Sequence, residues 1–244
     1  DAPYDTKLDK LIKSNIITQY WCIPSLVSQG SLNINNIFKS SVQPQNRIHF
    51  ITYSDHKYES SRKQLIQSAT KSKWFNTVTE FSPDNLTNEF KQKFHSILSQ
   101  NIGAGFWIWK IDIIQQMLSK IEYGDILIYC DAGCSINLLG YKRYQHYIQI
   151  LKDIKEGIIS FQMNQHLEKY WTKKEVFEYL NIDIDSDIGN SGQLIGGILL
   201  IKKNNNSLDI INKLRDILDK EPILFTNYMS QKQIKNFKSH RHDQ

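Results

Sequence analysis

An aspartate at the end of an apolar run is the first residue whose position suggests chemistry. Residues 126–130, Ile-Leu-Ile-Tyr-Cys, are followed at once by Asp131-Ala132-Gly133. A continuous apolar run bounded by turn residues is typical of a parallel strand covered on both faces. Open α/β sheets bind ligands just beyond the carboxyl ends of such strands. A carboxylate there could bind a divalent metal and, through it, a diphosphate. Alternatively, Asp131 only caps a turn.

A cation follows an unusual group of aromatic residues at 105–110, Gly-Phe-Trp-Ile-Trp-Lys. Lys110 stands at the start of a helix predicted over residues 111–120, and a lysine beside helix N-terminal amides suits a phosphate or a sugar hydroxyl. The glycine before two tryptophans indicates a tight turn against a ring-lined pocket. In the alternative interpretation, Trp107 and Trp109 simply pack between helix and sheet.

The sequence ends in a third chemical cluster, residues 240–244, His-Arg-His-Asp-Gln. Two histidines and an aspartate are metal-ligand types and also acid–base types, and a frayed charged tail is the alternative. Because the cluster stands at the end of the sequence, we expect the protein to continue beyond it. The first residue is not methionine, which suggests a trimmed or replaced N-terminus. The polar residues 1–13 predict no signal peptide.

A strand followed by a helix opens the clearly patterned part of the chain. Residues 47–55 predict a strand that ends in a Ser-Asp pair, and residues 58–72 predict a helix. Strand, polar loop and helix form the opening unit of a nucleotide-binding α/β fold. No Gly-x-Gly-x-x-Gly occurs here, which argues against a dinucleotide site.

The end of this strand and the helix after it supply candidate contacts to a nucleotide. Thr52, Tyr53 and Ser54 could contact a nucleoside, although polar residues after a strand usually form the turn. Arg62 and Lys63 could reach a phosphate, or they could lie on a solvated helix face. The sequence leaves both interpretations open.

The remaining pattern alternates strands with helices. Strands are predicted at residues 78–81, 158–162 and 196–201, the last of them led by Gly196 and Gly197. One helix is predicted to start at residues 82–84 and to carry an apolar stripe whose last residue is 98. Further helices are predicted over residues 139–152, 173–180 and 208–218, and Ser207 is expected to cap the last of them.

The segment 164–179 mixes polar and aromatic residues between a strand and a helix. Such a mixture is typical of a loop that meets a hydrophilic substrate. The side chains that could do so are His166, Glu168, Trp171, Lys173 and Lys174.

Composition places the chain among globular proteins. Its 244 residues are 40% hydrophobic and 23% charged, which is ordinary for a chain long enough to bury a substantial core. The longest apolar runs have strand length, which argues against a membrane span. Three cysteines without Cys-x-x-Cys spacing indicate reduced thiols in the cytosol.

The basic balance of the chain bears on its partners. A net charge of +5 and a pI near 8.9 favour anionic substrates such as nucleotides, or peripheral contact with the inner face of a membrane. Nucleic acid is supported by charge alone, because no zinc, helix-turn-helix or aromatic RNA-binding pattern accompanies it. We therefore expect no nucleic-acid partner.

The order of these elements resembles a GT-A-type glycosyltransferase, most closely the small transferases of capsule or lipopolysaccharide biosynthesis in bacteria and large DNA viruses. The resemblance implies one domain over residues 1–244, in which residues 1–46 form a poorly defined N-terminal segment. It implies an α/β fold with a Rossmann-type mixed, mostly parallel sheet and helices on both faces. The stretches that carry the resemblance are residues 105–110, 124–133, 171–174 and 240–244.

The resemblance also implies a metal site. Asp131 takes the place of the first acid of the family's Asp-x-Asp motif, but Gly133 stands where the second acid is expected. One metal ligand is therefore missing. Mn²⁺ or Mg²⁺ would then rely on Asp131 together with a histidine near the end of the sequence, His242.

The implied reaction moves a sugar from a nucleotide-sugar donor, a UDP- or GDP-sugar, to a hydroxyl of a glycan, lipid or protein. Glu168 and Asp243 are the candidate catalytic carboxylates, and the sequence leaves inverting and retaining mechanisms open. Acceptor contacts are expected from Trp171, Lys173 and Lys174. Donor contacts are expected from Thr52, Tyr53, Ser54, Arg62, Trp109, Lys110, Asp131, Ala132, Gly133, Gln193, Gly196 and Gly197.

Two other functions compete with the transferase. A phosphate-ester hydrolase could use Asp131 as its nucleophile, although Gly133 argues against the second acid that this chemistry usually needs. A non-catalytic nucleotide- or carbohydrate-binding domain with a decayed metal site is also consistent with the missing acid. Both alternatives place their ligand at the same edge of the predicted sheet.

Overall fold

The computed structural model describes residues 46–243 of the chain. Of the predicted N-terminal segment, residues 1–45 lie outside this range. Among the described residues, no helix is both long enough and apolar enough to cross a bilayer.

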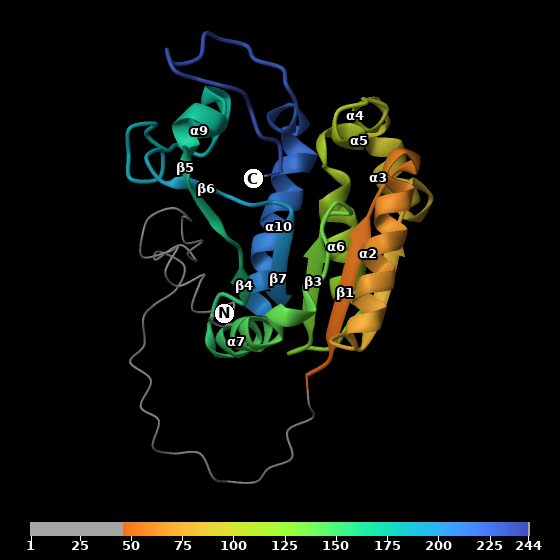
Figure 1. The fold of residues 1–244 in the computed structure, drawn as a ribbon. Helices are drawn as coiled ribbons and strands as arrows, with labels where there is room; N and C mark the ends of the chain where they lie inside the picture. The colour runs from red at the N-terminus through yellow and green to blue at the C-terminus, as the bar shows by residue number, and fades with distance from the viewer. Residues whose placement is uncertain (1–45, 244) are drawn as a thin grey trace, which may run out of the picture.

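A five-stranded sheet forms the centre of the fold, with the strand order β2-β1-β3-β7-β4 (Figure 1). β1 pairs in parallel with both β2 and β3, whereas β7 runs antiparallel to both β3 and β4. The predicted mixed, mostly parallel sheet is confirmed, and the strand before Asp131 has the predicted bounds. The five strands are β1 (Ile48–Tyr53), β2 (Thr77–Phe81), β3 (Ile126–Cys130), β4 (Ile158–Ile159) and β7 (Ile198–Lys202).

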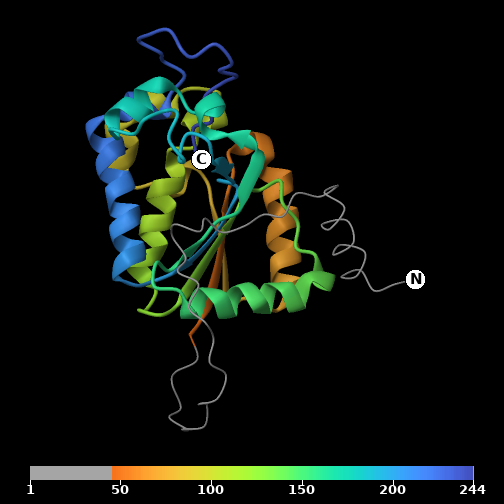
Figure 2. The same ribbon diagram turned by 90° about the vertical axis from the view of Figure 1, so that its left-hand side faces the viewer.

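Helices cover both faces of this sheet, as predicted (Figure 2). One face packs against α6 (Trp109–Lys120) and α10 (Asn205–Lys220), and the other packs against α2 (Glu59–Ser72) and α7 (Tyr141–Asp153). This arrangement places β3 between two apolar layers, which is why its sequence is apolar without interruption.

Alternation along β3 divides its side chains between the two layers. Leu127 and Tyr129 join the α6 and α10 layer, whereas Ile126, Ile128 and Cys130 join the α2 and α7 layer. The period of two in a strand causes this division. Because Tyr129 faces α6, its hydroxyl comes close to the residues that α6 brings to the edge of the sheet.

Short helices connect these elements. Two of them precede α6: α3 (Asn88–Lys93) and α4 (His95–Leu98), followed by the tightly wound α5 (Gly103–Phe106). The 3-10 turns are η1 (His56–Tyr58), η2 (Pro83–Asn85), η3 (Leu138–Gly140) and η4 (Pro222–Phe225).

The helix predicted from residue 82 begins later than expected. Ser82 opens only the 3-10 turn η2, and α3 starts after Thr87, whose hydroxyl accepts a hydrogen bond from the Phe90 amide. The same hydroxyl donates to Asp112 of α6 at 2.7 Å. This tertiary contact fixes the start of α3, and no local sequence pattern reports it.

The predicted cap of α10 is also displaced. Asn204 is the N-cap, and its side chain accepts from the Ser207 amide at 2.8 Å. The Ser207 hydroxyl is hydrogen-bonded to the Asn204 amide at 3.1 Å, so the two residues form a capping box. Ser207 thus belongs to the cap, three residues inside the helix that it was expected to begin.

A second, two-stranded sheet stands beside the first and replaces the loop predicted over residues 164–179. It pairs β5 (Gln162–Leu167) with β6 (Gly192–Leu194), and it carries α8 (Glu168–Trp171) and α9 (Lys174–Tyr179). The strand predicted over residues 158–162 splits, because Ile158 and Ile159 pair with β7, whereas Gln162 pairs with β6.

The last described residues return to the main sheet as an irregular segment, residues 226–243, which we call the C-terminal strap. Its backbone is tied to α8, because the Lys238 amide donates to the Tyr170 carbonyl at 2.8 Å and the Arg241 amide donates to the Trp171 carbonyl at 2.9 Å. The strap thereby brings the end of the described chain to the carboxyl edge of β1 and β3 (Figure 1).

Candidate functional site

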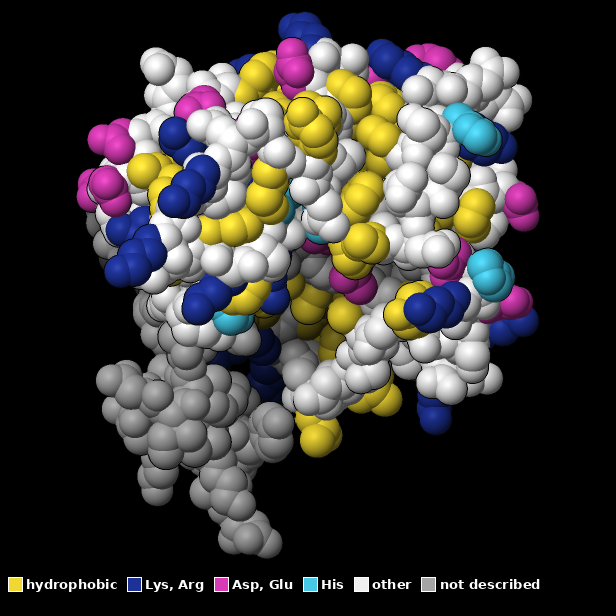
Figure 3. Space-filling view, turned by 90° about the horizontal axis from the view of Figure 1, so that it is seen from above, with side chains coloured by type: hydrophobic (Ala, Val, Ile, Leu, Met, Phe, Trp, Pro, Cys, Tyr) yellow, Lys and Arg dark blue, Asp and Glu magenta, His cyan; other side chains and the backbone are white. Residues whose placement is uncertain are grey.

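β1 and β3 point toward the side of the molecule that Figure 3 shows from above, where the surface is hollowed. Seen from above, the hollow separates two lobes, and its walls carry hydrophobic, acidic and basic side chains. The carboxyl edge of a parallel sheet is where α/β proteins bind ligands. The predicted site residues at the ends of β3 and α6 therefore lie in a suitable place.

Asp131 directs its carboxylate away from the turn that, in the alternative interpretation, it would only cap. Its amide donates to the Gly197 carbonyl at 2.8 Å, and its carbonyl accepts from the Cys134 amide at 2.9 Å, so the backbone alone closes the turn. The carboxylate instead accepts from the Tyr129 hydroxyl. The Asp131 side chain is 40% exposed, which leaves it accessible to a ligand.

Lys110 stands between two carboxylates. Its ammonium lies 2.5 Å from Asp243 Oδ2 and 3.4 Å from Asp131 Oδ1, and it donates to the Gly196 carbonyl at 2.8 Å. Its side chain is only 6% exposed and passes 4.8 Å from the centre of the Tyr129 ring. A cation this buried requires paired anions, which the two carboxylates supply, and the Gly196 carbonyl accepts a further hydrogen bond.

Gly196 and Gly197 allow the backbone to approach these carboxylates closely. A Cβ on Gly196 would overlap the Asp243 carbonyl oxygen and lie 2.7 Å from its Oδ2, and a Cβ on Gly197 would lie 2.8 Å from Asp131 Oδ2. Any larger residue therefore has to displace an acid. Gly133 is different, because nothing lies within 4 Å of the place where its Cβ would be.

We predict that Gly196→Ala lowers the free energy of unfolding by about 2 kcal/mol, because the new methyl group forces the Asp243 backbone away from Lys110. Urea denaturation followed by circular dichroism measures the change. Gly133→Ala is the matched control and should stay within about 0.5 kcal/mol of the original chain. Equal stabilities of the two variants would show that the strap is not packed against Gly196.

Two buried groups hold the strap that carries Asp243. Lys173 is 1% exposed, and its ammonium donates to the carbonyls of Ile223, Thr226 and Tyr228 at 2.7 to 2.9 Å. Burial lowers the pKa of Lys173 to about 8. Lys173 was expected to contact an acceptor, but all three ammonium hydrogens are directed at the backbone leading into the strap.

His240 is the second anchor of the strap. It is buried, its Nε2 donates to the Leu224 carbonyl at 2.9 Å, and burial lowers its pKa to about 4. A neutral imidazole suits this position, because the positive Lys173 lies nearby and its amide approaches His240 Nδ1 at 3.5 Å. His240 therefore belongs to the structural support of the site.

His242 lies at the aromatic wall of the site. Its ring packs against Phe106 and Trp107, with ring centres 4.8 and 5.8 Å apart. Its Nε2 lies 2.6 Å from Asn227 Oδ1, so the ring proton is on Nε2 and Nδ1 keeps its lone pair. Burial lowers the pKa of His242 to about 4, so the ring is neutral at physiological pH.

A stack of aromatic rings connects β1 with α6. Tyr53 lies flat on Trp109, with ring centres 3.7 Å apart and planes 19° apart. Trp109 is held by the bond from its indole N–H to the Gly103 carbonyl at 2.9 Å. The turn before it is wound in the left-handed region, with φ of +95° at Gly105. The sequence correctly indicated a tight turn against rings.

Beside this stack is a cavity of about 720 Å³. Most of the polar residues that line this cavity were not predicted from the sequence, because lysines, histidines and glutamines on short helices are typical of a solvent-exposed helix face. Its location after β1 was the only available signal. The cavity is lined by Tyr53, Asp55, His56, Lys57, Pro83, Leu86, Lys91, His95, Leu98, Ser99, Gln100, Asn101 and Ala104.

Three residues predicted to bind the donor are either hydrogen-bonded to other parts of the protein or buried. Arg62 bonds to Glu80 at 3.0 Å and to the carbonyls of Ser54 and Phe81 at 3.0 and 3.1 Å, so it ties β1 to β2. The hydroxyls of Thr52 and Ser54 are buried without a hydrogen-bond partner among the described residues. Of the strand-end group, Tyr53 alone lines the cavity.

Glu168 is half-buried at the start of α8. Its carboxylate accepts from the Thr172 hydroxyl at 2.5 Å and from the Gln193 amide at 3.2 Å. Burial raises the pKa of Glu168, although both hydrogen bonds act in the opposite direction. A carboxyl with a raised pKa is suited to accept a proton near neutral pH. Gln193, predicted to bind the donor, is instead fully buried behind Glu168.

The other predicted acceptor residues lie on the lobe formed by the second sheet. Trp171 packs against the Arg241 guanidinium at 5.0 Å and against His166. The Lys174 ammonium lies 3.3 Å from Glu178 and donates to Gln231. Both residues therefore hold the strap and its surroundings, and the acceptor role proposed for them stays a prediction.

Asp131 is the exposed carboxylate at this edge that a divalent metal could use, with a bound phosphate completing the coordination. Within residues 46–243, no three His, Cys, Asp or Glu side chains form a metal-binding group. Mg²⁺, however, is commonly held by one or two carboxylates together with substrate phosphates. Asp131 offers an exposed carboxylate. A metal-binding histidine usually donates its other ring N–H to an oxygen, as His242 does to Asn227.

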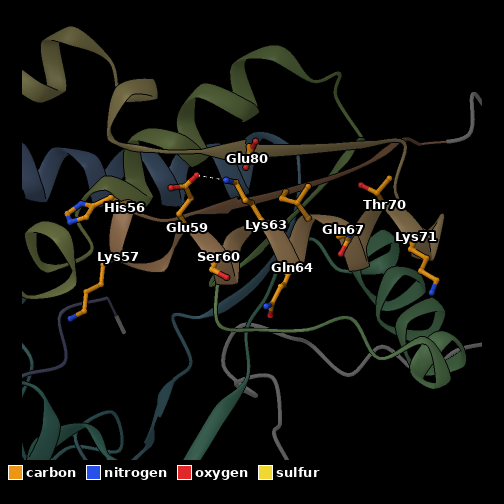
Figure 4. A pocket seen from close by; sticks show the side chains of 11 residues that line it. His56, Lys57, Glu59, Ser60, Lys63, Gln64, Gln67, Thr70, Lys71 and Glu80 are labelled. Carbon is orange, nitrogen blue, oxygen red and sulfur yellow. Dashed lines mark ion pairs between the residues drawn. The ribbon is translucent and has the colours of Figure 1, made fainter.

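A larger concavity of about 960 Å³ runs along the outer face of α2 (Figure 4). It is open and polar, and the Glu59–Lys63 ion pair of 2.6 Å crosses it. Its lining side chains, among them Ser60, Gln64 and Gln67, come mostly from a single helix face. The surface is thus the solvated side of α2, as one interpretation of Lys63 predicted.

Comparisons with known protein families and with curated proteins find no match. Two solved structures are similar in part. One is a glycosyltransferase involved in the glycosylation of the major capsid of PBCV-1, with 13% identity, a TM-score of 0.38, and coverage of 72% of this chain and 68% of that one. The other is the apo form of the glycosyltransferase GlyE of Streptococcus pneumoniae TIGR4. It has 16% identity and a TM-score of 0.29, and the match covers 72% of this chain and 39% of that one.

Proposed function

We propose that the chain is a glycosyltransferase that moves a sugar from a nucleotide-sugar donor to an acceptor hydroxyl. The observation that carries this proposal is the meeting of Asp131, Lys110 and Asp243 at the carboxyl edge of the sheet, against the glycine pair 196–197. A cavity lined by several polar side chains and by Tyr53 lies on the far side of the Tyr53–Trp109 stack, and Trp109 precedes Lys110 in the chain. The cavity would hold the nucleoside, the Asp131 edge would hold the diphosphate, and the space beside Asp243 and the glycine pair would hold the sugar.

The nucleoside would occupy the cavity beside Tyr53. Pyrimidine and purine bases present polar edges and flat faces, which suits amide side chains such as Gln100 and Asn101 and the cations Lys57 and Lys91 around an aromatic wall. The donor is proposed to be a UDP- or GDP-sugar. Its diphosphate would then extend from the cavity toward Asp131.

Charge at the site favours a metal. Asp131, Asp243 and Lys110 together carry one net negative charge, which would oppose a neighbouring diphosphate. A Mn²⁺ or Mg²⁺ ion held by Asp131, with His242 as second ligand, would supply the positive charge that stabilises the departing diphosphate. Lys110 would fix both carboxylates in place before the donor binds, so that little reorganisation is needed during transfer.

Glu168 is the better of the two proposed catalytic carboxylates for taking a proton from the acceptor hydroxyl. The Asp243 carboxylate is already paired with the Lys110 ammonium at 2.5 Å, which engages it within the site. Burial raises the pKa of Glu168. Asp243 would instead face the donor sugar, beside Gly196. The acceptor, a glycan or glycolipid, would approach from the lobe that bears α8.

Thermal-shift measurements with UDP, GDP and their sugars, each with and without Mn²⁺, test this function. Stabilisation by a nucleoside diphosphate in the presence of metal is expected, followed by slow release of that nucleotide from its sugar when water replaces the acceptor. No stabilisation by any nucleotide would overturn the proposal. Binding without release, even with glycan acceptors added, would identify the non-catalytic alternative.

The pH dependence of transfer should report Glu168. Because the pKa of this carboxyl is raised, its basic form is lost as the pH falls through a value above the ordinary one for glutamate. We therefore expect kcat/KM to fall on the acid side at that raised pKa. Glu168→Gln should lower kcat by at least about 100-fold and remove the acid limb, whereas the exposed control Glu221→Gln should change neither. An acid limb that survives in Glu168→Gln would assign the base to another residue.

A further inference from the structure

Several segments of the chain lack acidic residues, and two of them meet at one corner of the fold. Residues 70–79 and 132–152 contain no Asp or Glu, yet they hold Lys71, Lys73, Lys142, Arg143 and Lys152. Both segments are therefore locally basic.

The fold brings the two segments together. Trp74, just after α2, lies 5.3 Å from Tyr141 and stacks on Tyr144 of α7 at 4.8 Å between ring centres. The Tyr144 hydroxyl donates to the Trp74 carbonyl at 3.0 Å. Figure 2 shows α7 lying across the lower end of α2. Lys73 and Lys142 are chain neighbours of these stacked rings, so the cations surround an aromatic centre.

An exposed apolar tip projects from the same corner. Leu138 and Leu139 form η3, immediately before α7, and are 50% and 81% exposed, and Tyr141 is 44% exposed. Leu139 and its neighbour expose more apolar surface than a single scattered residue would. Tyr141, which follows them in the chain, has its ring centre 5.3 Å from that of Trp74. The corner thus combines apolar side chains, aromatic rings and cations.

The cations at this corner are not neutralised. Among the described residues, Lys71, Lys73, Lys142 and Arg143 are exposed and take part in no ion pair. We define the basic–apolar patch by these four residues together with Trp74, Leu138, Leu139 and Tyr141.

We propose that the basic–apolar patch binds the surface of an anionic lipid bilayer. Leucines and aromatic rings would enter the interface between headgroups and acyl chains, while the surrounding cations would meet anionic headgroups. A nucleic acid would use the cations alone, and the protruding leucines would then face water. The combination of an apolar tip with a basic rim is what favours the lipid surface.

The position of the patch is compatible with a working site. The patch lies at the amino ends of the parallel strands, whereas the hollow lies over their carboxyl ends at the opposite side of the molecule (Figures 1 and 2). A bilayer at α7 therefore leaves the hollow open to solvent. The proposal is independent of the proposed glycosyl transfer, since it uses no residue of that site.

Co-sedimentation of the full chain with lipid vesicles tests the proposal. Vesicles of phosphatidylcholine alone are compared with vesicles that also contain phosphatidylserine, at low and at high salt. Binding to the anionic vesicles is expected, and it should weaken as salt screens the cations. Equal binding to neutral vesicles, or no binding to anionic vesicles at low salt, overturns the proposal.

Two pairs of variants locate the contact. Lys142→Gln with Arg143→Gln should weaken binding by about 30-fold, whereas the charge-matched control Lys232→Gln with Lys235→Gln, on the exposed strap, should change it by less than about twofold. If both double variants lost vesicle binding to a similar extent, the attraction would come from net charge alone, and the proposed role of the basic–apolar patch would be refuted. The site-based thermal-shift response should be unchanged in all four substitutions.

The apolar tip separates lipid from nucleic acid. Leu138→Ser with Leu139→Ser should weaken vesicle binding by about tenfold, and the control Leu180→Ser with Ile188→Ser, also exposed, should not. Duplex DNA and single-stranded RNA are measured in parallel. The lipid assignment is overturned if either nucleic acid binds more tightly than the vesicles do and if this binding persists in the Leu138/Leu139 variant.

Discussion

Replacing Lys110 with methionine is expected to lower the free energy of unfolding by about 3 kcal/mol and to abolish nucleotide-sugar binding. The ammonium lies 2.5 Å from Asp243 and 3.4 Å from Asp131. Without it, two acids approach each other with no cation between them, and the Gly196 carbonyl loses its donor. Urea denaturation measures the first effect, and titration with a UDP- or GDP-sugar measures the second.

Two further variants make this result specific. Lys120→Met, an exposed lysine at the end of the same helix, should change stability by less than about 0.5 kcal/mol. Lys110→Met combined with Asp243→Asn removes one of the repelling charges, and should regain part of the stability but none of the binding. If the double variant is no more stable than Lys110→Met, the loss comes from packing and not from charge.

The second large effect is expected from Asp131→Asn. Asparagine keeps the shape of the side chain and can still accept from the Tyr129 hydroxyl, so the melting temperature should change little. Metal-dependent nucleotide binding should weaken by at least about 100-fold, because the negative charge that holds the metal is gone. Calorimetric titration of UDP and GDP, with and without Mn²⁺, measures it.

A matched control for this change is Asp153→Asn, at the far end of α7, which should bind as the original chain does. Nucleotide affinity that is unchanged in Asp131→Asn would remove Asp131 from the donor site and leave it a structural residue. Affinity that falls equally with and without metal would instead assign Asp131 to direct contact with the nucleotide. The titrations thus separate a metal ligand from a hydrogen-bonding residue.

Local pattern predicted the central sheet well, because its strands carry their own signal. The apolar run that ends at Cys130 can only be a strand covered on both faces, and the structure gives it the predicted bounds. The strand β5 was not predicted, because its sequence, Gln-Met-Asn-Gln-His-Leu, is mostly polar. Its pairing with β6, some thirty residues later in the chain, stabilises it.

The site could be predicted where chemistry and backbone coincide. Asp131, Lys110, Asp243 and the glycine pair 196–197 were all expected near a ligand, and the structure places them in contact. Lys173 was misplaced, because lysines are almost always exposed and a sequence does not reveal which carbonyls will surround one. The cavity beside Tyr53 was not predicted either, because three short helices have to converge to form it.

The ion pair that completes the site joins residues 133 positions apart in the chain. During synthesis, Lys110 and Asp131 leave the ribosome long before Asp243 does, so a nascent chain that has already formed its central sheet still lacks the anion nearest to the buried ammonium. The buried ammonium therefore gains its nearest anion only after residue 243 has been made and the strap has docked, so this site is completed later than the sheet that supports it.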